Sequence, residues 1–323
     1  ILCRELADEG LGALSFPTRY GGGGEPGRFV ATFETLAFGD LSVLVKFGVQ
    51  FGLFGGAVAL LGTERHHARY LQRIGTLELP GCFAMTESGH GSNVRDIATT
   101  AVYDAERDEL VVTTPDDAAR KDYIGNAALH GRLAVVFAQL EVGGEAHGVH
   151  AVLVPIRGDG GEPLAGIRVE DCGEKLGLNG VDNGRLWFDD VRVPRENLLN
   201  RFADIGADGT YSSRIPGADK RFFTTIGTLV GGRVSVALAG LSVAKSALTL
   251  AIEFTQRLLP GLLLVGGQVQ AAEKNADVRG DVHFASEQIP DVIFHDGWAV
   301  SGGMRVRGRR GARGAVAFRG SLS

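Results

Sequence analysis

The chain has few of the residues that would build a disulfide-bonded or metal-bound domain. Its 323 residues include only three cysteines, Cys3, Cys82 and Cys172, and no two of them have the C-x-x-C spacing of a zinc or redox site. Their low number and scattered positions argue against a disulfide framework and favour a reducing compartment. We therefore predict no metal site.

The chain also lacks a strong charge of one sign and a long apolar run. Its formal net charge is −5, with 22% charged and 44% hydrophobic residues. These values are ordinary for a globular protein and give no reason to expect a nucleic-acid partner. No run of about 18 apolar residues predicts a membrane span. The length allows two or three domains and a large buried core.

No targeting signal is visible at either end of the sequence. The first residues, Ile1 to Leu6, have the pattern of a helix and not of a signal peptide. The last three, Ser321 to Ser323, are Ser-Leu-Ser and not the S-K-L address of peroxisomes. The two ends therefore give no positive indication of a compartment.

What the sequence does contain is a periodicity that changes along the chain. Residues 1–79 carry apolar side chains at helical spacing. Residues 80–210 contain short β-rich runs, such as Leu133–Leu140 and Val149–Ile156, between turns rich in Gly, Asp and Pro. This second pattern predicts a small barrel or a pair of packed sheets.

Helical spacing returns in residues 211–323. Val234, Leu238 and Leu241 fall on one apolar face of a long helix, which is predicted to end near Pro260. The predicted fold class is therefore α+β. It has an N-terminal helical domain (1–79), a central β-barrel-like domain (80–210) and an incomplete C-terminal helical domain (211–323).

The end of the sequence, Arg305–Arg319, is a Gly/Arg-rich tail without apolar periodicity, and we predict no regular structure for it. Arginine/glycine-rich arms can bind RNA. In this tail only Phe318 could stack on a base, so RNA binding is the weakest of the functions that we consider.

Three separate motifs carry the functional signal. In the first, Cys82–Asn93, an apolar strand runs into Thr86, an acidic residue and a turn with two glycines. Such a turn lets the backbone approach a flat or anionic ligand closely, with N–H groups facing it. The second motif is K-D-Y-I-G-N-A at Lys121–Ala127, and the third is G-L-N-G-V-D-N-G at residues 177–184.

In order and spacing the three motifs are similar to those of the acyl-CoA dehydrogenase and oxidase family. The long turn A-M-T-E-S-G-H-G-S and the segments His147–His150 and Asp208–Tyr211 resemble the oxidase branch. The resemblance covers roughly residues 5–256. It implies FAD as cofactor and oxidation of acyl-CoA to trans-2-enoyl-CoA in fatty-acid β-oxidation. A glutamate base removes the α-proton while the β-hydrogen leaves as hydride to the flavin.

The resemblance also implies roles for particular residues. Thr86 is expected to contact the flavin ring, with Met85 beside it. Gly125 is expected to touch FAD, with Tyr123 and Ile124 near the face of the ring. These five residues are the predicted cofactor site.

Two further residues match family positions that contact acyl-CoA, Ser92 at the end of the long turn and Arg233 at the start of the long helix. The family's catalytic glutamate lies in a Phe-Glu-Gly-like segment, and no such segment follows Gln256. Neither Glu273 nor Glu287 lies in a matching context, so the catalytic residue stays unknown. We expect the C-terminal catalytic part to be truncated or altered.

Two functions therefore stay open. One is FAD-dependent oxidation of acyl-CoA, and the other is a non-catalytic relative that binds flavin or acyl-CoA or acts as a partner subunit. The family resemblance implies a homodimer for intact members, an expectation that does not extend to this chain. It also implies a cytoplasmic location in a bacterium or a peroxisomal one in a eukaryote.

Overall fold

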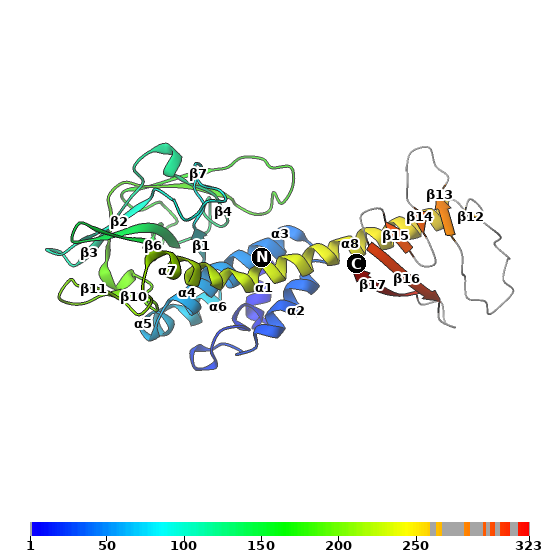
Figure 1. Ribbon diagram of the computed structural model, residues 1–323, viewed down its shortest axis with the longest axis horizontal. Helices are drawn as coiled ribbons and strands as arrows, with labels where there is room; N and C mark the ends of the chain where they lie inside the picture. The colour runs from blue at the N-terminus through cyan, green and yellow to red at the C-terminus, as the bar shows by residue number, and fades with distance from the viewer. Residues whose placement is uncertain are drawn as a thin grey trace. The chain divides into compact units, whose positions relative to one another are not determined.

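The computed structural model describes residues 2–258 and, beyond them, the backbone of six short strands (Figure 1). The chain divides into two compact units, Ile1–Ala244 and Lys245–Ser323. All the predicted site residues lie in the first unit. The predicted Gly/Arg-rich tail lies in the second unit, and the side chains of the tail fall outside the described residues.

The N-terminal part is helical, as predicted. Pro26 is the first residue of one helix, a position at which the N–H that proline lacks would have no partner within the helix. The Asp40 side chain caps the following helix by accepting a hydrogen bond from the Val43 N–H at 2.9 Å. The α-helices are α1 (Leu2–Asp8), α2 (Pro26–Leu36), α3 (Leu41–Phe47), α4 (Gly55–Leu61), α5 (Glu64–His66) and α6 (Gln72–Gly75). They are joined by two 3₁₀-helices, η1 (Leu11–Ala13) and η2 (Thr18–Tyr20), and by two π-helical segments, η3 (Gly48–Phe54) and η4 (His67–Leu71).

By length and composition alone, two helical stretches could cross a membrane, Leu41–Leu61 and Ala218–Thr255. This evidence is weak, because the core helix of a globular protein passes the same test. The first stretch is such a core helix, since Phe47, Phe51 and Phe54 are fully buried in it.

The central part is built from two sheets, as the alternating pattern predicted. The larger sheet has six strands in the order β1-β5-β2-β3-β9, with β6 paired to β5. Its strands are β1 (Gly81–Ala84), β2 (Thr100–Asp104), β3 (Glu109–Thr113), β5 (Leu133–Val142), β6 (Glu145–Pro155) and β9 (Val191–Pro194). The smaller sheet has the order β4-β8-β7, from β4 (Lys121–Ile124), β8 (Gly184–Phe188) and β7 (Ile167–Asp171).

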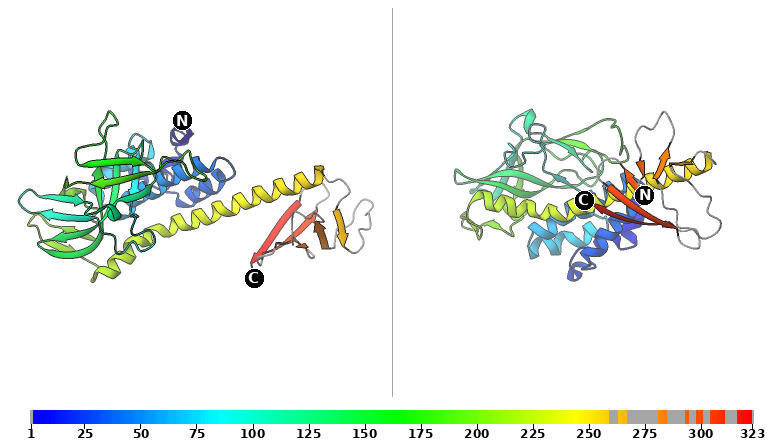
Figure 2. Two further views of the ribbon diagram at one scale, coloured as in Figure 1. Left: turned by 90° about the horizontal axis from the view of Figure 1, so that it is seen from above. Right: turned by 45° about the vertical axis from the view of Figure 1, so that its right-hand side comes forward.

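Strand β5 lies at the centre of the β region and is buried on both faces. Because side chains alternate along a strand, Ala134, Val136 and their alternate neighbours enter the core between the two sheets. Val135 and Phe137 enter a second core formed with α4 and α6. Figure 2 shows the N-terminal helices to one side of the sheets. Short elements complete this region, η5 (Asp117–Ala119), η6 (Arg195–Asn197), β10 (Ala203–Ile205) and β11 (Tyr211–Ser213).

Helices α7 (Ala218–Ile226) and α8 (Val230–Leu258), joined by the turn η7 (Gly227–Leu229), follow the sheets. The long helix was predicted, and the face that it buries in the first unit is not the one that carries Val234 and Leu241. Val234 and Leu241 are 51% and 41% exposed, whereas Ser235, Ala239 and Ser242 are buried. Ala239 packs in the aromatic cluster of α2, α3 and η3. Its small side chain allows the close approach of α8 that a larger one would prevent.

Beyond α8, the described backbone of the second unit forms two three-stranded antiparallel sheets, β12-β13-β14 and β15-β16-β17. Their strands are β12 (Leu263–Gly266), β13 (Asp281–Phe284), β14 (Ile293–Phe294), β15 (Trp298–Val300), β16 (Met304–Arg310) and β17 (Val316–Leu322). The sequence predicted no regular structure for this part of the chain, because its apolar residues follow no period.

Candidate functional site

The first two motifs meet where β1 ends and β4 begins. The Thr86 hydroxyl donates to the Asp122 carbonyl at 3.1 Å, and the Asp122 N–H donates to the Thr86 carbonyl at 3.1 Å. Strand β1 belongs to the larger sheet and β4 to the smaller one. These two hydrogen bonds therefore join the sheets at the point where the sequence predicts cofactor contacts.

The third motif lies on the other side of β4. Strand β4 pairs antiparallel with β8, so that Ile124 faces Gly184, the last residue of the motif. The Asn183 amide donates to the Tyr123 carbonyl at 2.9 Å. Three motifs that are far apart in the sequence are thus brought together at one edge of the smaller sheet.

Tyr123 has an unusual backbone at this edge. Its φ is +55°, a left-handed conformation that costs a residue with a side chain about 1–2 kcal/mol. The Asp122 carboxylate accepts from its N–H at 2.9 Å, and Asn183 holds its carbonyl. Tyr123 as a whole residue is 60% exposed. Strained residues of this kind often occur at ligand sites, and here the strain presents an aromatic face to solvent.

The other predicted cofactor residues lie close by, but their side chains are not at the surface. Met85 is buried in the core shared with the helices, and Ile124 is buried in the core between the sheets. Only the main chain of these two residues could contact a ligand at the edge. A Cβ added at Gly125 would lie 2.8 Å from a methyl carbon of Val49. Close packing on η3 is therefore sufficient to explain this glycine.

The two predicted substrate residues are both exposed, Ser92 in the long turn and Arg233 near the start of α8. Within residues 2–255, the structure records no contact from either side chain to the predicted cofactor residues. Their exposure is compatible with a role in binding, and their grouping into one site stays a prediction.

Sequence reasoning missed a buried ion pair beneath the first two motifs. Lys121 and Glu87 are both completely buried, and the Lys121 Nζ lies 2.9 Å from the Glu87 carboxylate. Burial opposes ionisation of Glu87, but the Lys121 ammonium and hydrogen bonds from Thr99 and Ala98 hold its pKa below the usual range. Burial lowers the pKa of Lys121 to about 8, against the attraction of Glu87. Lys121 stands between Arg120 and Asp122, and Glu87 between Thr86 and Ser88, so the local sequence gave no signal that this pair is buried.

A second polar cluster fixes the third motif to the N-terminal helices. Asp182 is almost fully buried and forms an ion pair with Lys46 of α3. Its other oxygen accepts from the Leu129 and His130 N–H groups at 3.1 and 3.0 Å. Burial opposes ionisation of Asp182, but Lys46 and His130 hold its pKa below the usual range. The cluster holds residues 177–184 in place beside Tyr123.

The two oxidase-like segments also meet, in a different place. The His147 ring stacks on the Tyr211 ring at 3.7 Å between centroids, and the His150 Nε2 lies 3.0 Å from the Tyr211 hydroxyl. Burial lowers the pKa of His150 to about 4, so the imidazole is neutral. The Arg221 guanidinium donates to the His147 carbonyl at 2.9 Å, which ties α7 to β6.

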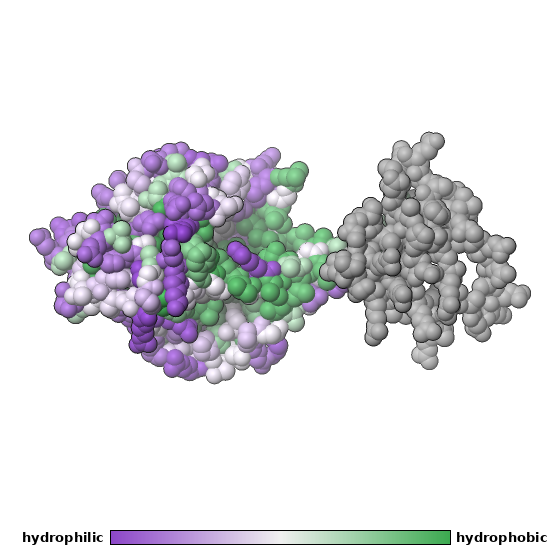
Figure 3. All heavy atoms as spheres, viewed as in Figure 1, coloured by the Kyte–Doolittle hydropathy of each residue, from purple (hydrophilic) through white to green (hydrophobic). Residues whose placement is uncertain are grey.

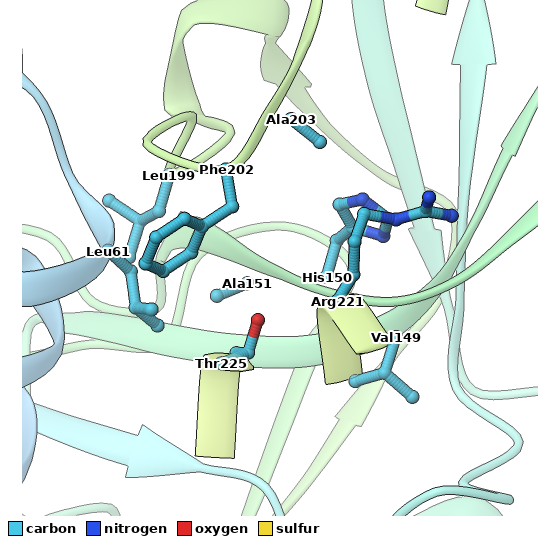
Figure 4. Close-up of a pocket in the computed structure, with 9 residues that line it drawn as sticks. All are labelled: Leu61, Val149, His150, Ala151, Leu199, Phe202, Ala203, Arg221 and Thr225. Carbon is cyan, nitrogen blue, oxygen red and sulfur yellow. The ribbon is translucent and has the colours of Figure 1, made fainter. Parts of the chain in front are cut away.

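A small pocket lies beside this histidine cluster (Figure 4). None of the predicted cofactor or substrate residues lines it. The lining residues are Leu61, Val149, His150, Ala151, Leu199, Phe202, Ala203, Arg221 and Thr225. Among the side chains that the structure describes, no group of three or more His, Cys, Asp or Glu is placed to hold a metal ion.

Two family models match the chain. The N-terminal domain of acyl-CoA dehydrogenase matches residues 2–78, and the middle domain of acyl-CoA dehydrogenase matches residues 82–191. Peroxisomal acyl-coenzyme A oxidase 2 of Arabidopsis thaliana is 49% identical over 238 residues, which is 72% of this chain and 34% of the relative. Peroxisomal acyl-coenzyme A oxidase 3 of Homo sapiens is 41% identical over 232 residues, 71% of this chain and 33% of the relative.

Solved structures give the same result. Acyl-CoA oxidase 3 of Yarrowia lipolytica matches with a TM-score of 0.64 at 33% identity, over 76% of this chain and 34% of that one. Acyl-CoA oxidase-2 of Caenorhabditis elegans, solved with FAD, ascaroside-CoA and ATP, matches with a TM-score of 0.54 at 35% identity, over 57% and 27%. The chain thus spans about a third of the length of the curated relatives it matches.

Proposed function

This chain belongs to the acyl-CoA dehydrogenase family, and we propose that it acts in the FAD-dependent oxidation of acyl-CoA to trans-2-enoyl-CoA. The observation that carries the proposal is the meeting of the three motifs around β4. The Thr86–Asp122 hydrogen bonds and the Asn183–Tyr123 hydrogen bond bring them to one edge. The relatives and solved structures reported above are named as acyl-CoA oxidases, which supports an oxidase over a dehydrogenase.

The residues at this edge fit a flavin. An isoalloxazine ring has a flat apolar face and an edge of hydrogen-bonding atoms, and the site offers both kinds of partner. The exposed Tyr123 ring supplies a flat surface. The Thr86 hydroxyl and the main chain of Met85, Ile124 and Gly125 supply polar groups. FAD supplies the redox chemistry when it is bound, and the protein binds and orients it.

The apolar surface beside this edge suits a long acyl chain. Figure 3 shows apolar side chains gathered over α3 and the first half of α8. Along α8 itself, Val234, Val236 and Leu241 are exposed. Arg233 is a neighbour in sequence, and its guanidinium could pair with a phosphate of coenzyme A. We propose that Ser92 and Arg233 contact this substrate.

The domain limits and the location are proposals as well. We place boundaries after residues 79 and 210. The end of the N-terminal family match at residue 78 supports the first boundary, whereas the middle-domain match ends at residue 191 and does not define the second. Several relatives are named as peroxisomal enzymes, which supports a peroxisomal location if the source is a eukaryote. The homodimer expected for intact family members stays a prediction.

A flavin titration followed by substrate addition tests the function. We expect purified protein to bind FAD and to develop a protein-bound flavin absorbance spectrum. Octanoyl-CoA and palmitoyl-CoA should then perturb that spectrum. Binding of both ligands without reduction of the flavin would support the alternative of a non-catalytic relative, and no binding of flavin at millimolar FAD would overturn the proposal.

A further inference from the structure

The buried ion pair of Lys121 and Glu87 has its full complement of partners. The three N–H bonds of the Lys121 ammonium point to Met85 O at 3.1 Å, Glu87 Oε1 at 2.9 Å and Phe137 O at 2.7 Å. An ammonium has three donors, so none is left over. The Glu87 carboxylate accepts from the Ala98 N–H at 2.7 Å, and from the Thr99 N–H and hydroxyl at 2.9 and 2.6 Å.

Such a pair is a poor way to gain stability. Removing two charges from water costs several kcal/mol for each ion, and apolar residues of the same volume are often as stable or more so. A fully satisfied buried network does, however, fix its neighbours in one arrangement. The question is therefore which groups this network fixes.

The network fixes the two strand ends of the proposed flavin site. Lys121 is the first residue of β4 in the smaller sheet, while its partners Met85 and Phe137 belong to the end of β1 and to β5 of the larger sheet. By holding the Met85 carbonyl inside the protein, Lys121 sets the plane of the Met85–Thr86 peptide. The adjoining Thr86–Asp122 hydrogen bonds then set the distance from that peptide to Tyr123.

Resting on the proposed function, we infer that Lys121 and Glu87 are positioning residues for the flavin. They touch no ligand themselves. Their buried hydrogen bonds hold the Met85–Thr86 peptide and the Asp122–Gly125 segment at the spacing that the flavin ring requires. Loosening that spacing changes how the ring is bound, and not only whether the domain is folded.

The test uses a variant that removes both charges together. Lys121→Met alone would leave Glu87 buried without a partner and could unfold the domain. In Lys121→Met/Glu87→Gln both charges are gone, and the glutamine oxygen can still accept from Thr99. Asn197→Ala is the matched control, because Asn197 is buried in the same domain and donates at 2.7 Å to Leu153 O, away from the motifs.

The readouts are thermal unfolding, flavin affinity, and the visible absorbance and fluorescence of bound flavin at saturating FAD. Loss of a hydrogen bond to a charged group corresponds to an affinity that is weaker by roughly 10- to 100-fold. We expect the double variant to bind FAD more weakly by that factor and to give a shifted spectrum at saturation. The control should unfold at a lower temperature with an unchanged spectrum.

The possible results separate the two ideas. A double variant with the flavin affinity and the saturated spectrum of the wild type would overturn the positioning role and leave the proposed function intact. A folded double variant that binds flavin weakly but gives an unchanged spectrum would show that Lys121 and Glu87 have a structural role only. That result would also overturn the inference. Absence of flavin binding by the wild type would overturn the proposed function, and the inference with it.

Discussion

The absence of a side chain at Gly125 has one reason in the structure and a second in the proposed flavin site. A flavin approaching the main chain would exclude a Cβ, and so does Val49, whose methyl carbon lies 2.8 Å from the position a Cβ would take. One reason involves the flavin and the other involves the Val49 side chain. A substitution of Val49, which the resemblance does not assign to the cofactor, can therefore separate them.

We predict that Gly125→Val destabilises the fold by about 1–3 kcal/mol, because it overpacks the contact with η3. Val49→Ala in the same chain should restore most of that stability. If a ligand also approaches Gly125, flavin affinity will stay low in the double variant; if it recovers with stability, packing is the only reason for the glycine. Gly56→Ala, with no atom near its Cβ, is the control for urea unfolding.

Burial of His150 leads us to predict how the free energy of unfolding depends on pH. Burial holds its folded pKa at about 4, below the ordinary 6.5, so the unfolded chain binds the proton first as the pH falls. The free energy of unfolding should therefore decrease between about pH 6.5 and 4, by on the order of 3 kcal/mol from this residue. His150→Gln should reduce the slope and leave the contribution of His66, whose pKa burial also lowers to about 4. Tyr211→Phe keeps the imidazole and should keep the slope, which chemical denaturation at several pH values can measure.

At the scale of elements, α3 contacts the third motif through the Lys46–Asp182 ion pair and through a hydrogen bond from the Gly180 N–H to the Ser42 hydroxyl at 3.3 Å. Lys46→Met would leave Asp182 nearly buried without its cation, although two backbone N–H groups remain bound to it. We predict a loss of about 1–3 kcal/mol, less than for a fully buried pair because Lys46 is partly exposed. Adding Asp182→Asn should recover part of it. Equal unfolding midpoints for the wild type and Lys46→Met would show that the pair contributes nothing.

The elements differ in how far the sequence could predict them. The run from Leu133 to Leu140 predicted a strand because a strand buried on both faces has almost no polar residue. The sequence predicted the helix α8 and its apolar face but not the face that packs in the first unit, because hydrophobicity ranks Val234 and Leu241 above Ala239, whereas close helix packing requires small side chains. A pattern along one segment does not contain the shape of the surface it packs against.

The candidate site shows the same limit for polar groups. The structure brings the first two motifs together, since Thr86 and Asp122 are hydrogen-bonded across two sheets, and the role of this site stays a prediction. Lys121 and Glu87 were overlooked because charged residues are expected at the surface. Their burial depends on partners such as Phe137 O and Thr99, which only the folded chain brings within reach.

For the whole molecule, the last prediction concerns turnover by the polypeptide of residues 1–323. Its sequence has no Phe-Glu-Gly-like segment after Gln256, and loss of a positioned general base typically lowers a rate by about 10²–10⁴-fold. We expect FAD-loaded protein to be reduced by octanoyl-CoA or palmitoyl-CoA slower by that factor than a full-length oxidase measured in parallel. Both the rate of flavin bleaching under anaerobic conditions and acyl-CoA affinity should be measured, since weak binding alone would be overcome by raising the substrate concentration. Bleaching within seconds would contradict the prediction and assign the base to another carboxylate, for which Glu273→Gln and Glu287→Gln are the first variants to compare.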